Sequence, residues 1–164
     1  LYPGTGFLHE TGAGDGTGYT VNVPMPPAAS DDAYEYVLDE LFAPLAEEFS
    51  PQIIIRNGGS DPHFADELTN LGLTLDGLRM VGSKVGEVAD SVCDGRAVDL
   101  VGSGYNQTVL PYGWLSSIAG LAGMDIEPKE PFVFSLKRDY RLQQTIELVD
   151  DIKAKLKDFW RCLS

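Results

Sequence analysis

The sequence predicts an α/β fold with a mostly parallel sheet and helices on both of its faces. Strand-like and helix-like segments alternate along the chain, which is typical of βα units. Two of the strand-like segments are short and almost wholly apolar, as expected for strands buried inside such a sheet. The chain has 164 residues, of which 43% are apolar, and this is enough to bury the core of one domain over residues 1–164.

The first third of the chain predicts a loop, a strand and a helix. Residues 1–18 contain six glycines, which favour a surface loop. The alternating run at 19–24 predicts a strand that ends at Pro24. Ser30 can cap a helix whose apolar residues recur at helical spacing, and Pro44 should kink this helix. Its apolar face consists of Tyr34, Leu38, Leu41, Leu45 and Phe49.

The rest of the chain continues the alternation of strands and helices. The apolar run at 52–56 predicts a strand buried on both faces, and a second such run follows at 97–101. Between them, an amphipathic helix should begin near Thr74 and end at Asp94 and Gly95. Two further helices are predicted, one at 107–122 and an amphipathic one at about 136–163.

Asp61 follows the first buried strand, at the carboxyl edge where parallel sheets form their sites. With His63 and Asp66 close by, it could hold a divalent cation. The alternative is a capping loop between strand and helix, in which Asp61 and Asp66 accept hydrogen bonds from the backbone. The local sequence favours the capping loop.

Tyr105 follows the second buried strand in the same way, in a turn flanked by glycines. Its phenol could face a cleft and donate a hydrogen bond to a developing oxyanion. Alternatively, the ring packs against its neighbours and the glycines serve only a tight turn between strand and helix. Asp61 and Tyr105 are thus the two candidate functional residues that the strand pattern places together.

The net charge of −13 makes a phosphate-binding surface hard to build, so nucleic acid is not an expected partner. Such a charge favours cationic partners, although it also serves ordinary solubility. Cys93 and Cys162 form no disulfide or zinc pattern, which predicts a reducing, cytoplasmic location. The chain contains no run of about 18 apolar residues, so a membrane is not an expected partner. Because the chain begins with Leu1, we expect it to be part of a longer one.

Four stretches, taken in order, resemble the second half of the zinc-dependent histone deacetylase and acetylpolyamine amidohydrolase family. The resemblance covers roughly residues 1–122 and implies an arginase/deacetylase type of fold, of which this chain holds the carboxyl-terminal half. The family's whole domain is about twice as long. The stretches are Tyr2-Pro3-Gly4-Thr5-Gly6 with Asn22-Val23-Pro24, Gly59-Ser60-Asp61 with Asp66, Leu73-Thr74, and Gly104-Tyr105-Asn106 with Trp114.

The resemblance implies a role for each matching residue. Asp61 falls on the last of three zinc ligands, and Tyr105 on the tyrosine that stabilises the oxyanion. Tyr2 matches an aromatic residue that lines the acyl-lysine channel, Leu68 matches an apolar wall position, and Gly104 keeps the channel floor open. The other zinc ligands and the catalytic histidines are expected before Leu1, so His63 is not one of them.

The resemblance implies that the intact protein removes acetyl groups from acetyl-lysine or acetylated polyamines, with Zn²⁺ as cofactor. We expect this chain alone to be inactive and to bind zinc weakly, because its partner, the amino-terminal half of the same fold, is missing. Two alternatives remain open at this point. The chain is a non-catalytic interaction module derived from the deacetylase fold, or it is an unrelated metal hydrolase built on Asp61, His63 and Asp66.

Overall fold

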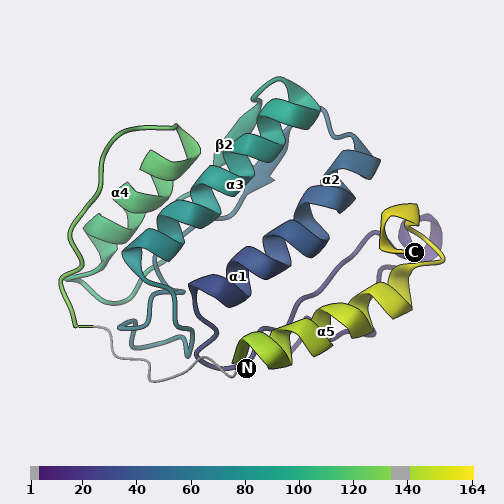
Figure 1. Ribbon diagram of the computed structural model, residues 1–164, viewed down its shortest axis with the longest axis horizontal. Coiled ribbons are helices and arrows are strands. Elements are labelled where there is room, and N and C mark those ends of the chain that lie inside the picture. The colour runs from purple at the N-terminus through teal and green to yellow at the C-terminus, as the bar shows by residue number, and fades with distance from the viewer. Residues whose placement is uncertain (1–3, 134–140) are drawn as a thin grey trace.

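The computed structural model describes residues 4–133 and 141–164 and has the predicted α/β architecture with parallel strands (Figure 1). Tyr2 and the predicted start of the last helix lie outside the described residues. The elements, in chain order, are η1 (Gly14–Gly16), α1 (Asp31–Val37), η2 (Leu38–Phe42), α2 (Ala43–Phe49), β1 (Ile54–Arg56), α3 (Leu75–Cys93), β2 (Ala97–Asp99), α4 (Leu110–Leu121), α5 (Arg141–Leu156) and η3 (Arg161–Leu163).

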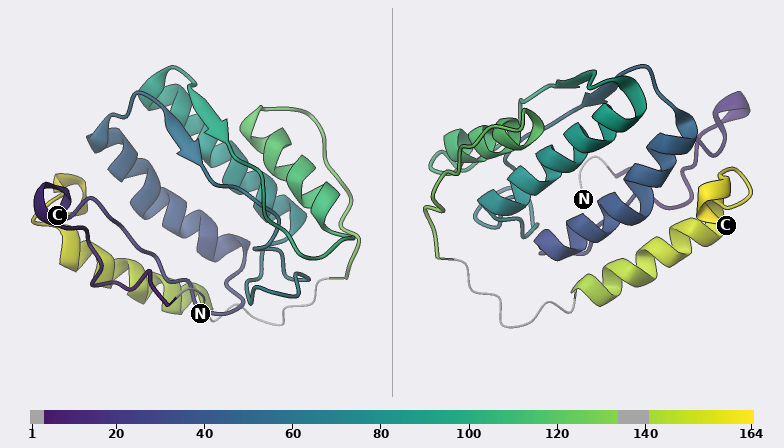
Figure 2. Two further views of the ribbon diagram at one scale, coloured as in Figure 1. Left: turned by 180° about the vertical axis from the view of Figure 1, so that it is seen from behind. Right: turned by 45° about the horizontal axis from the view of Figure 1, so that its top comes forward.

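β1 and β2 pair in parallel, with Arg56 opposite Asp99, and α3 connects them. The helices lie behind the strands in the left view of Figure 2, which leaves the near face of the sheet bare in the part of the chain described. On that face Ile55 is 64% exposed and Val98 is 43% exposed. The expectation that both strands are buried on both faces is therefore wrong for the described residues, because apolar content alone does not say which segment covers a face.

The strand predicted at 19–24 does not form. This segment runs extended beside α5, where Val21 and Val23 pack against a buried cluster. A strand needs a neighbour to accept and donate its ladder hydrogen bonds, and within residues 4–133 and 141–164 the only named strands pair with each other. The buried cluster consists of Leu41, Val149, Ile152, Leu156, Trp160 and Leu163.

The first helix changes its hydrogen-bond pattern next to Pro44, and the kink predicted there stays a prediction. The change takes the form of the π-helical turn η2 between α1 and α2. Proline lacks the N–H that would continue the α-helical ladder, and a single π turn is a common way to accommodate such a break. Ser30 is at the N-cap, and the helix ends at Ser50, which has a left-handed backbone conformation.

α3 and α4 lie against each other at close range. A Cβ at Gly82 would stand 2.3 Å from the carbonyl oxygen of Ser117, and one at Gly120 would stand 2.1 Å from that of Arg79. The two glycines therefore allow the helix backbones to approach. This contact holds α4 beside the carboxyl edge of the strands, where the candidate site lies.

The last helix is shorter than predicted, since α5 ends at Leu156 and not near 163. Trp160 is extended, with φ −130° and ψ 117°, which stops the helical path and buries its ring. Its indole N–H donates to the carbonyl of Gly18 at 2.8 Å, so the carboxyl-terminal turn holds the glycine-rich loop. Among the helices that the structure describes, none has the length and apolar character needed to cross a membrane.

Candidate functional site

The loops after β1 and β2 begin side by side, as the strand pattern predicts. Beyond the strands, the backbone N–H of Ser60 donates to the carbonyl of Ser103 at 2.9 Å, and Gly59 and Ser103 form a further parallel bridge. The hydroxyl of Ser103 then donates to Oδ1 of Asp61 at 2.5 Å. The carboxylate of Asp61 and the loop that carries Tyr105 are thus joined directly.

Glycine is required at two positions in these loops. A Cβ at Gly59 would lie 1.8 Å from the hydroxyl oxygen of Ser103, which would block the bridge between the loops. Gly104 has φ +144°, and a Cβ there would lie 2.1 Å from the hydroxyl oxygen of Ser60. Gly104 therefore serves the close packing of the two loops, and its role beside an open channel stays a prediction.

Asp61 and the nearby phenol of Tyr34 are both partly buried. Burial, and secondly the negative charge of Asp61, raise the pKa of Tyr34 above its usual range, so this phenol stays neutral. The hydroxyl of Thr69 donates to the carbonyl oxygen of Asp61, which closes the loop behind the carboxylate.

Asp66 has the capping role that the local sequence favoured. Its Oδ1 accepts hydrogen bonds from the N–H groups of Leu68 and Thr69, and its Oδ2 accepts from those of Tyr105 and Asn106. Among the residues that the structure describes, the side chain of Asp61 accepts no hydrogen bond from a backbone N–H, so this half of the prediction is wrong there. Its Oδ1 accepts instead from the hydroxyl of Ser103.

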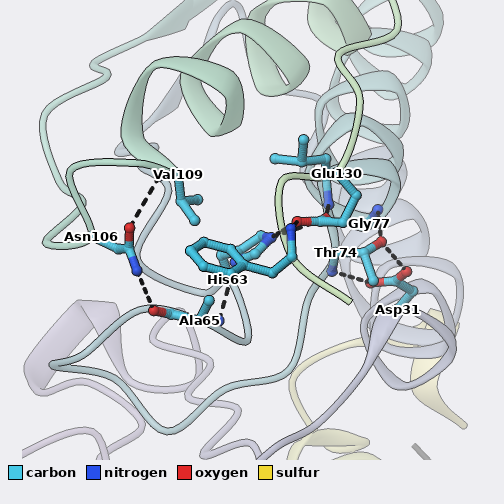
Figure 3. A network of polar contacts seen from close by, with 10 residues as sticks. Asp31, His63, Ala65, Thr74, Gly77, Asn106, Val109 and Glu130 are labelled. Carbon is cyan, nitrogen blue, oxygen red and sulfur yellow. Dashed lines mark hydrogen bonds and ion pairs between the residues drawn. The ribbon is translucent and has the colours of Figure 1, made fainter. Parts of the chain in front are cut away.

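His63 is fully buried. Its ring points towards Glu130 (Figure 3). Its Nδ1 accepts from the N–H of Ala65 at 3.1 Å, which assigns the ring proton to Nε2. Nε2 lies 3.1 Å from both carboxylate oxygens of Glu130. Glu130 also accepts from the N–H of Leu75, so this network fixes the first turn of α3. The hypothesis of a metal hydrolase built on Asp61, His63 and Asp66 is therefore wrong.

A buried ion pair lies under the loops, between β1 and β2. Nη1 of Arg56 is 3.6 Å from the carboxylate of Asp99, and Nη2 donates to the hydroxyl of Ser117 on α4 at 2.5 Å. Burial lowers the pKa of the Arg56 guanidinium, while the charge of Asp99 opposes that shift. Sequence reasoning missed this pair, because it depends on the register of two strands that are distant in the chain.

The candidate substrate-facing residues are accessible. Tyr105 is 54% exposed and Leu68 is 68% exposed, which fits residues that line a surface, whereas Tyr2 lies outside the described residues. Within the described residues, no group of three or more His, Cys, Asp and Glu side chains is arranged to hold a metal ion. Asp61 is thus a single candidate ligand, and a complete metal site requires donors from beyond these residues.

Comparison with known sequences identifies the kind of fold that these loops belong to. The family model described as "Histone deacetylase domain" matches residues 1–121. A probable deacetylase of Archaeoglobus fulgidus is 40% identical over 169 residues, which cover 99% of this chain and 47% of the relative. The acetoin utilization protein AcuC of Staphylococcus xylosus is 36% identical over 75% of this chain and 32% of its own length.

Solved structures agree with the sequence matches. The structure of the histone deacetylase Clr3 superposes on the whole chain with a TM-score of 0.81 and 23% identity, but this chain covers 26% of it. The HDA15 HD domain gives a TM-score of 0.79 at 26% identity, with 99% of this chain and 42% of that one covered. The chain therefore spans less than half of the length of these relatives.

Proposed function

Because the chain belongs to the histone deacetylase family, we propose that it supplies the carboxyl-terminal half of a zinc-dependent amidohydrolase site. The observation that carries this proposal is the junction of two loops at the carboxyl ends of adjacent parallel strands. One loop presents Asp61, the other presents Tyr105, and the Ser103 hydroxyl and the Asp66 carboxylate join them. The reaction is hydrolysis of an acetamide.

The two candidate residues have separate tasks. The carboxylate of Asp61 is the ligand that this chain offers to zinc, with Ser103 fixing its orientation. Zinc, when bound, polarises the acetamide carbonyl and lowers the pKa of a bound water to about 7. The exposed phenol of Tyr105 donates a hydrogen bond to the carbonyl oxygen as it gains negative charge. The family resemblance assigns Leu68 and Tyr2 to the wall around the acyl chain.

The site is completed by the amino-terminal half of the same fold. Catalytic zinc sites use about three protein ligands, and Asp61 is one. The exposed apolar face of β1 and β2, with Ile55 and Val98, supports a partner that covers the sheet. We therefore expect the isolated chain to be inactive and to hold zinc weakly.

Acetylated amines are the substrates that the charge favours. A net charge of −13 attracts cationic molecules. Acetylated polyamines keep their unmodified ammonium groups, and an acetyl-lysine peptide is cationic where other Lys or Arg residues lie near the neutral acetyl-lysine. The same field repels nucleic acid. The relative rates of acetate release from an acetyl-lysine peptide and from an acetylated polyamine would show which of the two classes is the preferred substrate.

A chimaera tests the proposal. This chain replaces the matching part of the Archaeoglobus fulgidus deacetylase, and release of acetate from an acetyl-lysine peptide and from acetylspermidine is measured. We expect turnover that requires zinc and is abolished by Asp61→Ala, while Asp125→Ala, which alters an exposed carboxylate, leaves it unchanged.

Two outcomes would contradict the proposal in different ways. A folded, zinc-loaded chimaera without turnover would favour the alternative of a non-catalytic interaction module. Turnover by the isolated chain, lost on Asp61→Ala, would show that the site needs no second half.

A further inference from the structure

The side chain of Asp66 connects the two loops of the proposed site. It is 8% exposed, and both of its carboxylate oxygens accept hydrogen bonds from backbone N–H groups. On the side of its own loop, Oδ1 lies 2.9 Å from the nitrogen of Leu68 and 3.3 Å from that of Thr69. On the side of the other loop, which follows β2, Oδ2 lies 2.8 Å from the nitrogen of Tyr105 and 3.3 Å from that of Asn106.

Burying a carboxylate raises the free energy of the folded state unless hydrogen-bond donors satisfy its oxygens. The position of the Tyr105 backbone is therefore coupled to that of the Asp66 side chain. Moving the backbone of Tyr105 away from the Asp66 loop would leave Oδ2 without its donors. The same loop is tied to the candidate zinc ligand, because Thr69 donates its hydroxyl to the carbonyl of Asp61. A continuous set of hydrogen bonds thus runs from Asp61 through Thr69 and Asp66 to Tyr105.

Tyr105 depends on such a tether for its position. Its side chain is more than half exposed, and Gly104 before it has a backbone conformation that glycine adopts freely. A second tie lies at the next residue, where the amide group of Asn106 donates to the carbonyl of Ala65 at 2.7 Å. Both ties lead to the segment that contains Asp66, which makes this segment the reference for the position of Tyr105.

We propose that Asp66 is a positioning residue that sets the location of Tyr105 relative to Asp61 and acts on the reaction through Tyr105. The proposal rests on the function proposed above. Asp66 touches neither metal nor substrate in this role; it holds the N–H of Tyr105, and with it the direction in which the phenol leaves the loop. A purely structural role would instead affect the fold without acting through the phenol.

The first test uses this chain alone and measures exchange of backbone amide hydrogens by NMR. In the unsubstituted chain, the amides of Tyr105 and Asn106 should exchange at least about tenfold more slowly than in an unstructured peptide. In Asp66→Asn, which keeps the size of the side chain but turns one acceptor into a donor, they should exchange faster. Glu67→Gln, which removes an adjacent exposed charge, should leave them unchanged.

The unsubstituted measurement keeps the proposal testable even if Asp66→Asn does not fold. Exchange of the Tyr105 amide at the rate of an unstructured peptide would overturn the tether by itself. Since this test needs no activity, its result is independent of the proposed function.

The second test is a double-mutant cycle in the active chimaera. Asp66→Asn should lower kcat about tenfold to a hundredfold and change KM by less than about threefold, because the phenol acts in the transition state. In a Tyr105→Phe background, Asp66→Asn should have little further effect on kcat. Equal effects of Asp66→Asn in both backgrounds would overturn the positioning role and leave a structural one, whereas a chimaera inactive before any substitution would contradict the proposed function.

Discussion

The carboxyl edge of the small sheet and its bare face differ in the interactions that this chain supplies to them. At the carboxyl edge, the loops around Asp61 and Tyr105 are joined by hydrogen bonds within this chain, through Ser103, Asp66 and Asn106. On the bare face, apolar side chains such as that of Ile55 are exposed. The geometry of the loops is therefore set by contacts within the described residues, whereas these residues leave one face of the sheet uncovered.

Gly104→Ala is expected to reduce stability the most, because the added methyl group would push the two joined loops apart. The new Cβ would lie 2.1 Å from the hydroxyl oxygen of Ser60, and φ of +144° is strained for any residue but glycine. The substitution should lower the free energy of unfolding by about 2–4 kcal/mol, measured by urea titration. Gly123→Ala is the control, since Gly123 also has a positive φ, of +62°, but open space around its Cβ, and it should cost about 1 kcal/mol.

Equal losses for the two glycines would contradict the close packing of the loops, since only the backbone strain is common to both positions.

Two serines in the joined loops differ in their hydrogen bonds. The Ser103 hydroxyl donates to Asp61, so Ser103→Ala should lower the free energy of unfolding by about 1–2 kcal/mol. The Ser60 hydroxyl is buried and, within the described residues, has no hydrogen-bond partner. Ser60→Ala should therefore change stability by about 0.5 kcal/mol or less, or raise it. Thermal unfolding of both variants checks this, and a larger loss for Ser60→Ala would contradict the contacts described.

The sequence predicts local features of the loops better than contacts between distant segments. The structure confirms that the loops of Asp61 and Tyr105 begin at one edge of the sheet, because parallel strands end together there, while the roles of the two residues stay predictions. The capping role of Asp66 is confirmed as well, because an aspartate in a short loop binds local backbone N–H groups. Contacts between distant segments gave no local signal, as for Glu130, which binds His63 from 67 residues away. The family resemblance, confirmed by the match over residues 1–121, came from motifs in register rather than from any one contact.

The wrong predictions have a common physical cause. The run at 19–24 has the alternation of a strand, but a strand forms only where a neighbour pairs with it, and local sequence does not supply that neighbour. The apolar runs of β1 and β2 suit burial on both faces, yet in the described residues helices cover one face. Both errors concern which segments lie beside a strand, and local sequence does not specify those segments.

The smallest effect is expected on the bare face, where two adjacent isoleucines make a matched pair. Ile54 is partly buried towards the helices and Ile55 is 64% exposed. In the isolated chain, Ile54→Thr should lower the free energy of unfolding by about 1–2 kcal/mol, and Ile55→Thr should change it by less than about 0.5 kcal/mol. In the chimaera, Ile55→Thr should become as costly as Ile54→Thr, because the added half covers the face. An equally large loss for Ile55→Thr in the isolated chain would mean that the face is already buried, and light scattering would then show self-association that diminishes in the variant.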